Sequence, residues 1–194
     1  MRRITRTLRL GLLVLALLAA VSATPAAAGG EHGRPVERPY MSRTISASGP
    51  GTDCTTFEVI STDPLIIECP YGPRVNERQT THLGRNTNTL IGVTRLEIPR
   101  VACVDYLGRP GVTSTTIYDA VAIAANGSEL STHGEWTACF QDGVGGNGSG
   151  TVTFTGGTGR FEGASGSATF DWFVQNVDEP GVGEPGTDTG TIIY

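Results

Sequence analysis

Tyr118, His133 and Glu135, in the middle of the chain, are of the types that perform acid–base chemistry. They lie on two runs of alternating residues that are separated by Asn126-Gly127. Asn-Gly is the preferred pair of a two-residue hairpin turn, which would place Tyr118 directly opposite Glu135 on one face. If this face lined an interior, the histidine and the carboxylate could exchange protons with a substrate. If it faces solvent, which its polar neighbours favour, the three are ordinary surface residues.

The same turn fixes the two faces of the predicted hairpin. Side chains alternate between the two faces of a strand. One face is apolar and is expected to pack in the core, whereas the face that carries Tyr118 has polar or small side chains. The apolar face comprises Ile117, Val121, Ile123, Leu130 and Trp136, and it continues with Ala138 and Phe140.

The glycine-rich segment 155–166 predicts a sharp corner between two antiparallel strands. It contains five glycines, which lack Cβ and therefore allow a positive φ or a close backbone approach. Phe161 is expected to close one end of the fold. Arg160 is expected to bond to loop carbonyls or to stack on an aromatic ring, and a ligand-binding role is its alternative. The structural turn residues are Gly156, Gly157, Gly159 and Phe161 in this corner, and Asn126 and Gly127 in the hairpin.

The four cysteines predict two disulfides. Cys54 and Cys69 lie on short β-rich runs that are separated by the turn-like segment 61–64. If the two runs form a hairpin, the cysteines occupy opposite positions on neighbouring strands, where Cβ atoms come within reach of a disulfide. Cys103–Cys139 then follows by elimination. A zinc site is disfavoured, because the chain has no Cys-x-x-Cys pair.

No metal or cofactor site is predicted. An acidic loop near the C-terminus has a spacing that matches no calcium-binding loop. Its carboxylates are Asp178, Glu179, Glu184 and Asp188. The segment 143–148 satisfies G-x-G-x-x-G, but a strand is expected after it, where a dinucleotide site requires a helix. The segment is interpreted as part of a flexible glycine-rich loop at 142–150.

Residues 1–28 are predicted to be a signal peptide, with four arginines before an apolar run and small residues at 26–28. A flexible N-terminal lead at 29–39 and one domain at 40–194 would follow, secreted to the extracellular space and without a membrane span. Loss of the signal peptide leaves ten basic and nineteen acidic residues. An acidic chain without a basic stripe is unsuited to binding nucleic acid.

Short strand-like runs with turn residues between them predict an all-β fold. The expected architecture is a single antiparallel β-barrel of about eight strands with two disulfides. A barrel removes unpaired edges, and at this size its interior holds side chains or one small ligand. The segment 70–76 is expected to be a turn between two of the strands.

Three segments resemble a known family. The segment 156–161, GGTGRF, resembles the corner of the allene-oxide-cyclase and dirigent-like β-barrels. The segment 80–85 resembles a strand of small secreted actinobacterial barrel proteins, and the segment 124–130 resembles the hairpin that follows in those proteins. The resemblance covers most of residues 80–174 and implies a calycin-type barrel. It also implies a cofactor-free isomerase or cyclase that closes rings in the lumen. It allows a homo-oligomer, since related plant barrels are trimers.

Three functions follow as hypotheses. The first is a secreted, non-catalytic barrel that binds a small apolar ligand or a protein partner, with Arg160, Trp136 and Trp172 as candidate ligand-binding residues. The second is the isomerase or cyclase, for which the three acid–base side chains described above are the catalytic candidates. The third is an extracellular inhibitor or interaction protein that uses the loops at 141–150 and 176–188. Export favours the first over the second, because pathway enzymes usually stay with cytoplasmic substrates.

Overall fold

The computed structural model describes residues 34–141, 145–174 and 186–194. Within these ranges the chain forms ten β-strands, one short 3-10 helix and no α-helix. No helix of this part is long and apolar enough to cross a membrane. The predicted signal peptide lies outside the described residues. The strands are β1 (Glu37–Ser48), β2 (Glu58–Thr62), β3 (Leu65–Thr80), β4 (Gly84–Ile98), β5 (Ala102–Val104), β6 (Pro110–Ile123), β7 (Glu129–Gln141), β8 (Gly145–Gly157), β9 (Ser165–Val174) and β10 (Thr187–Ile193), and the 3-10 helix η1 spans Gly159–Phe161.

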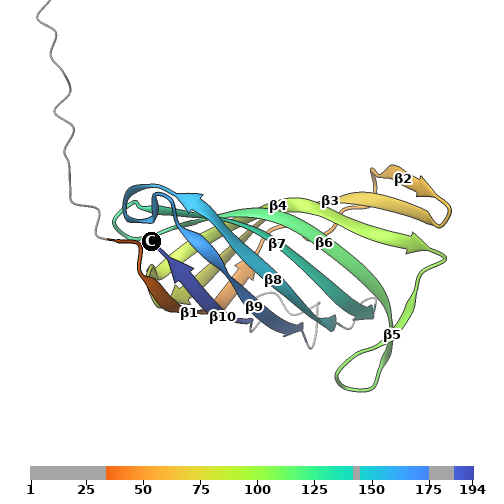
Figure 1. Ribbon diagram of the computed structural model, residues 1–194. Coiled ribbons are helices and arrows are strands. Elements are labelled where there is room, and N and C mark those ends of the chain that lie inside the picture. Colours follow the sequence, from red (N-terminus) through yellow and green to blue (C-terminus); the bar gives the residue numbers. More distant parts are fainter. Residues whose placement is uncertain (1–33, 142–144, 175–185) are drawn as a thin grey trace, which may run out of the picture. The chain divides into compact units, whose positions relative to one another are not determined.

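Eight strands form a closed antiparallel ring, in which each strand is hydrogen-bonded to two neighbours (Figure 1). Around the ring the order is β1, β10, β9, β8, β7, β6, β4 and β3, and β3 pairs again with β1. β2 pairs with β3, and β5 pairs with β6, beside the ring. The all-β, antiparallel architecture that the sequence predicts is therefore confirmed.

Strand β3 continues through the segment 70–76, so the turn predicted there is wrong. A β-bulge between Tyr71 and Arg74 shifts the pairing of β3 with β4 by one residue. Gly72 and Pro73 lie at this bulge, and Gly72 has a φ of 86°. Because a bulge leaves residues out of the ladder, Pro73, which has no N–H to donate, fits there without breaking a ladder hydrogen bond. The Gly-Pro pair therefore marks a bulge within the strand.

The hairpin between β6 and β7 has a three-residue loop instead of the predicted two-residue turn. The N–H of Gly127 donates to the carbonyl of Ala124 (2.9 Å), and the N–H of Ala124 donates to the carbonyl of Ser128 (2.9 Å). Gly127 has a φ of 81°, which is typical of a type I turn followed by a left-handed glycine. The extra residue moves the register by one, so that Tyr118 lies opposite Gly134.

This shift of one residue reverses the two faces of β6, because side chains alternate along a strand. Tyr118 and Ala120 are buried (6% and 3% exposed), whereas Val121 and Ile123 face outward (37% and 49% exposed). The prediction that Val121 and Ile123 pack in the core is therefore wrong. On β7 the predicted face is correct, and Trp136 is buried (8% exposed).

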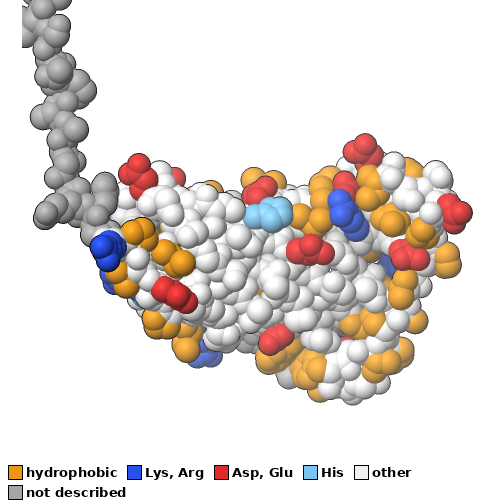
Figure 2. Space-filling model, viewed as in Figure 1, with side chains coloured by type: hydrophobic (Ala, Val, Ile, Leu, Met, Phe, Trp, Pro, Cys, Tyr) orange, Lys and Arg blue, Asp and Glu red, His pale blue; other side chains and the backbone are white. Residues whose placement is uncertain are grey.

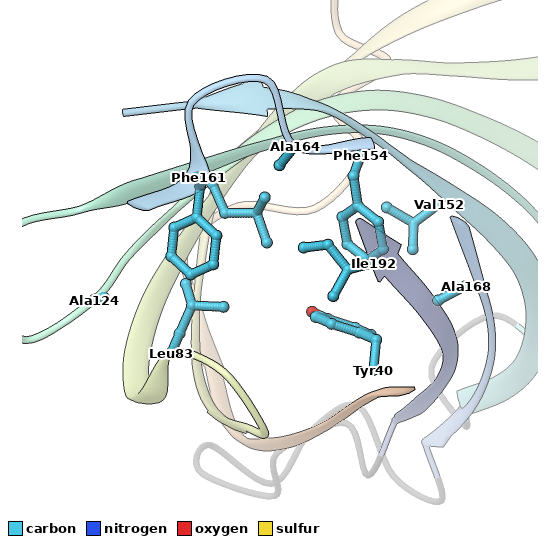
Figure 3. Packing of buried hydrophobic residues seen from close by; sticks show 10 residues of the cluster. Tyr40, Leu83, Ala124, Val152, Phe154, Phe161, Ala164, Ala168 and Ile192 are labelled. Carbon is cyan, nitrogen blue, oxygen red and sulfur yellow. The ribbon is translucent and has the colours of Figure 1, made fainter. Parts of the chain in front are cut away.

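An apolar cluster at the glycine corner fills one end of the ring (Figure 3). Gly156 and Gly159 have φ of 127° and 60° and turn the chain from β8 through η1 toward β9. Phe161 of η1 is fully buried, and its ring lies 5.1 Å from the ring of Tyr194 between centroids. Figure 3 shows side chains of the cluster pointing toward one another from several strands; they include Tyr40, Leu83, Val152, Phe154, Phe161 and Ile192.

Both predicted disulfides are present. Cys54–Cys69 joins the segment before β2 to β3, and Cys103–Cys139 joins β5 to β7. In Figure 1 β2 and β5 lie at the right, and the C-terminus, which packs beside the glycine corner, lies at the left. The two bridges therefore fasten the elements that project from the end of the ring opposite the packed corner.

Removal of the Cys103–Cys139 bridge is expected to destabilise the fold more than removal of Cys54–Cys69. The first bridge spans a sequence separation of 36 residues and the second spans 15, and in the chain-entropy model such loops correspond to about 4 and about 3 kcal/mol. Denaturant unfolding of the two double-alanine variants measures both losses. An equal loss, or a larger one for Cys54–Cys69, would show that native contacts around the bridges outweigh loop entropy.

Candidate functional site

A cavity of about 510 Å³ occupies the part of the ring interior that the Phe161 cluster leaves unfilled. Its lining includes residues of β3, β4, β6, β7, β9 and β10. It extends to the end of the ring that carries β2 and β5, because Cys54 and Arg100 contribute to its lining. Figure 2 shows hydrophobic side chains gathered at that end, at the right of the view. The exposed apolar residues there include Phe57, Val59, Ile60, Val104 and Leu107.

Aromatic side chains form much of the cavity wall. Trp136 lies at the centre of this group, with ring centroids 4.9 Å from Tyr118 and 5.2 Å from Tyr71. Trp172 packs 5.3 Å from Phe140 and 6.4 Å from Trp136. Tilted and edge-to-face contacts of this kind favour fixed ring orientations. The wall thus offers flat apolar surfaces to a bound molecule.

Two glycines opposite the aromatic rings give them room. Tyr118 pairs with Gly134 across β6 and β7, and a Cβ at residue 134 would lie 2.2 Å from Cζ of Tyr118. Trp172 pairs with Gly148 across β8 and β9, and a Cβ there would lie 2.7 Å from Cε2 of the indole. Only glycine allows an approach this close. Gly148 lies in β8, so the loop predicted at 142–150 is wrong for this part.

A buried ion pair lies at the floor of the cavity. Nη2 of Arg78 on β3 donates to Oδ1 of Asp188 on β10 (2.5 Å), and the two side chains are 12% and 5% exposed. Burial raises the pKa of the Asp188 carboxyl, and the Arg78 guanidinium opposes this rise. Burial is the largest single influence on the pKa of Arg78 and lowers it, but the charge and hydrogen bond of Asp188, together with Tyr40 and Tyr118, more than offset burial, so the pKa is raised. The other carboxylates of the predicted acidic loop, Asp178, Glu179 and Glu184, lie outside the described residues.

Two tyrosines near the ion pair keep their protons. Burial raises the pKa of Tyr40 to about 12, and the charges of Arg78 and Asp188 act on it in opposite directions. Burial also raises the pKa of Tyr118, and the Asp188 charge adds to this rise. Tyr118 lines the cavity, and its hydroxyl is a neutral hydrogen-bonding group at physiological pH.

The inner face of β3 presents a polar row to the cavity. After the bulge at 72–73, Arg74, Asn76 and Arg78 alternate toward the interior, and all three contribute to the lining. In the described part of the chain, Oδ1 of Asn76 and Nε of Arg78 are buried without a hydrogen-bond partner. Such atoms are suited to contact a bound molecule, because leaving them without a partner is costly. Sequence reasoning missed the row because it assigned 70–76 to a turn, although the alternation of the three polar residues was the available signal.

The three residues proposed for acid–base chemistry do not form one site. Tyr118 lines the cavity, whereas His133 and Glu135 are exposed on the outer face of β7. Nδ1 of His133 lies 2.9 Å from Oδ1 of Asp119, which is also exposed. The register shift in the hairpin separates them, because it places Tyr118 on the inner face and the other two on the outer face.

Of the predicted ligand-binding residues, Trp136 and Trp172 line the cavity, whereas Arg160 lies at the glycine corner. Arg160 is exposed; its Nη2 donates to the carbonyl of His82, and its guanidinium lies 4.8 Å from the ring centroid of Phe161. These are the structural contacts that the sequence analysis expected of this residue. They fasten the corner to the turn between β3 and β4.

Comparisons of the chain with protein-family models, with curated proteins and with solved structures found no match. Function is therefore inferred from the cavity itself, that is, from its size, its aromatic wall and the polar row on β3.

Asp188→Asn is expected to destabilise the protein by about 3–5 kcal/mol, because it leaves the buried Arg78 cation without its counter-charge. Replacing both partners, as Arg78→Met with Asp188→Leu, is expected to recover most of this loss, since neither charge is then buried alone. Glu77→Gln is the control: it breaks an exposed pair with Arg85 (side chains 46% and 71% exposed) and should cost under about 1 kcal/mol. Denaturant unfolding measures all three variants. If Asp188→Asn lowered the free energy of unfolding as little as the control does, Asp188 would not be the counter-charge that the buried Arg78 requires.

Proposed function

We propose that this protein is a secreted β-barrel that encloses a small, largely apolar ligand in its lumen. The cavity of about 510 Å³ carries the proposal, because small-molecule sites span about 300–1,000 Å³. Such sites also combine an apolar, aromatic lining with a few polar groups that fix the orientation of the ligand. The closed ring of eight strands is compatible with the allene-oxide-cyclase and dirigent-like barrels that the sequence resembles.

Two further observations support this proposal. Two disulfides suit an extracellular location, because such bonds persist in oxidising compartments. The apolar surface beside the cavity, which includes Phe57 and Leu107, favours capture of an apolar ligand and would also suit a protein partner.

The protonation states on the cavity wall favour binding over acid–base catalysis. General acids and bases work best when their pKa is near the operating pH. Tyr118 has its pKa raised away from neutrality, and the Asp188 carboxylate is bound to Arg78. His133 lies on the outer face of the sheet. The groups that face the cavity are therefore suited to orient a ligand without exchanging protons with it.

A cofactor-free isomerase or cyclase is the second candidate, and the convergence of Asn76, Arg78 and Tyr118 on one cavity favours it. Such an enzyme needs no proton transfer if the cavity holds a substrate in the folded conformation that precedes ring closure. Incubation of a co-purifying molecule with the protein, followed by chromatography and mass spectrometry, distinguishes the two candidates. A carrier returns the molecule unchanged, whereas an isomerase returns a species of equal mass with a different retention time.

The binding test uses the protein's own fluorescence, because Trp136 and Trp172 are the two tryptophans of the chain and both line the cavity. The neutral dye N-phenyl-1-naphthylamine should bind with one-to-one stoichiometry and quench tryptophan emission by energy transfer. Ser114→Phe, which adds a ring inside the cavity, should weaken dye binding at least about tenfold. Thr115→Phe, at the adjacent outward position of β6, is the matched control and should leave the affinity within about twofold.

Equal dye binding by the two phenylalanine variants would place the dye on the outer surface and would contradict the proposal. Binding of several dye molecules per chain would also contradict the proposal. Circular dichroism and thermal unfolding of each variant show whether a loss of binding comes from loss of the fold.

A further inference from the structure

Some polar groups of the cavity bond to one another, whereas others have atoms without a partner. The hydroxyls of Thr52, Thr94 and Thr116 line the cavity and form a chain, with Oγ1–Oγ1 distances of 2.7 Å and 2.9 Å. Two of the three hydroxyl protons are therefore used within the wall itself. At the floor, in contrast, Oδ1 of Asn76 and Nε of Arg78 are buried and have no hydrogen-bond partner among the described residues.

Asn76 and Arg78 are neighbours on the inner face of β3. The half-exposed side chain of Glu77 lies between them on the outer face, so their Cα atoms are about 7 Å apart along the strand. Both residues line the cavity, and they are well buried, with Asn76 7% exposed and the Arg78 side chain 12% exposed. The first atom accepts a hydrogen bond and the second donates one. The complementary ligand group therefore has a donor and an acceptor a few bonds apart.

The charges at the floor of the cavity are balanced. Nη2 of Arg78 donates to Oδ1 of Asp188, and burial keeps the Tyr118 hydroxyl protonated by raising its pKa. A charged ligand group placed against this ion pair would meet one attractive and one repulsive charge, and it would also lose its hydration. An uncharged group avoids that cost and still forms hydrogen bonds with both unpartnered atoms.

We infer that the ligand has an uncharged amide group, with an N–H beside a carbonyl, which Asn76 and Arg78 bind at the floor of the cavity. The ligand N–H donates to Oδ1 of Asn76, and the ligand carbonyl accepts from Nε of Arg78. The apolar body of the ligand then packs against the aromatic wall, which includes Trp136 and Trp172. Binding removes the cost of two buried polar atoms without partners. This inference rests on the proposed function, because it assumes that the cavity is a ligand site.

Two ligands of similar shape test the bond to the N–H. 2-Naphthamide has an N–H beside its carbonyl, whereas 2-acetylnaphthalene has a methyl group in the same place. Each ligand displaces N-phenyl-1-naphthylamine from the protein, and the dye affinity of each variant converts displacement into ligand affinity. Asn76→Leu is expected to lower the preference for 2-naphthamide over 2-acetylnaphthalene about tenfold, because the bound N–H is then buried without an acceptor.

Asn88→Leu is the matched control. Asn88 lies directly opposite Asn76 on β4 and is 8% exposed, but it is not among the described residues of the cavity lining. The same substitution there should leave the preference within about twofold. A second variant, Arg78→Met with Asp188→Leu, removes the donor to the carbonyl that both ligands share. Both affinities are therefore expected to fall about tenfold relative to that for the dye, which has no carbonyl.

The outcomes separate this inference from the proposed function. Absence of dye binding, or dye binding that Ser114→Phe does not affect, would overturn the proposed function. If Ser114→Phe weakens the dye but folded Asn76→Leu keeps the wild-type preference, only the inference about the amide is overturned. An equal change of preference in Asn88→Leu would also count against it, since the effect would not come from the cavity. If Asn76→Leu does not fold, the double variant decides, and unchanged affinities for both carbonyl ligands overturn the inference.

Discussion

Pairing of β1 with both β10 and β3 is the constraint on which the cavity depends. The first half of β1 continues the ladder of β10, and its second half, from Ser42 to Ser48, pairs with β3. A shift in this pairing between Thr44 and Ser46 marks a β-bulge, which bends the strand where it passes from one neighbour to the other. Without this contact β1 and β3 would each have a free edge. Closure converts the inner face of the sheet into an interior.

The interior is filled at one end and hollow at the other. At the glycine corner the large side chains of Phe161, Phe154 and Ile192 meet. In the other half, Gly134 lies opposite Tyr118 and Gly148 lies opposite Trp172. Each aromatic ring covers the backbone of its glycine, in the space that a side chain at that position would otherwise fill. Aromatic side chains on one strand thus lie opposite glycines on the next. This arrangement and the curvature of the sheet together shape the cavity.

The fold class follows from the sequence because it depends on local patterns, namely alternating runs, turn residues and four cysteines. The residues of the cavity do not follow, because they depend on strand register. Asn126-Gly127 marks the β6–β7 turn, but the length of the loop decides whether Tyr118 points in or out. Gly72-Pro73 fits a turn or a bulge equally well on local grounds, and only the long pairing of β3 with β4 makes it a bulge. Long-range pairing thus supplies what the local pattern lacks.

The Arg78–Asp188 pair is the feature that folding explains least. Removing two charges from water is costly, so a buried ion pair seldom stabilises a fold more than apolar residues of the same volume do. The Phe161 cluster shows that this interior accommodates purely apolar packing. The pair nevertheless lies between that cluster and the cavity, in electrostatic contact with Tyr40 on one side and Tyr118 on the other. Under the proposed function, polar groups at the floor of the aromatic cavity would orient the ligand, and this use would account for a cost that the fold alone does not require.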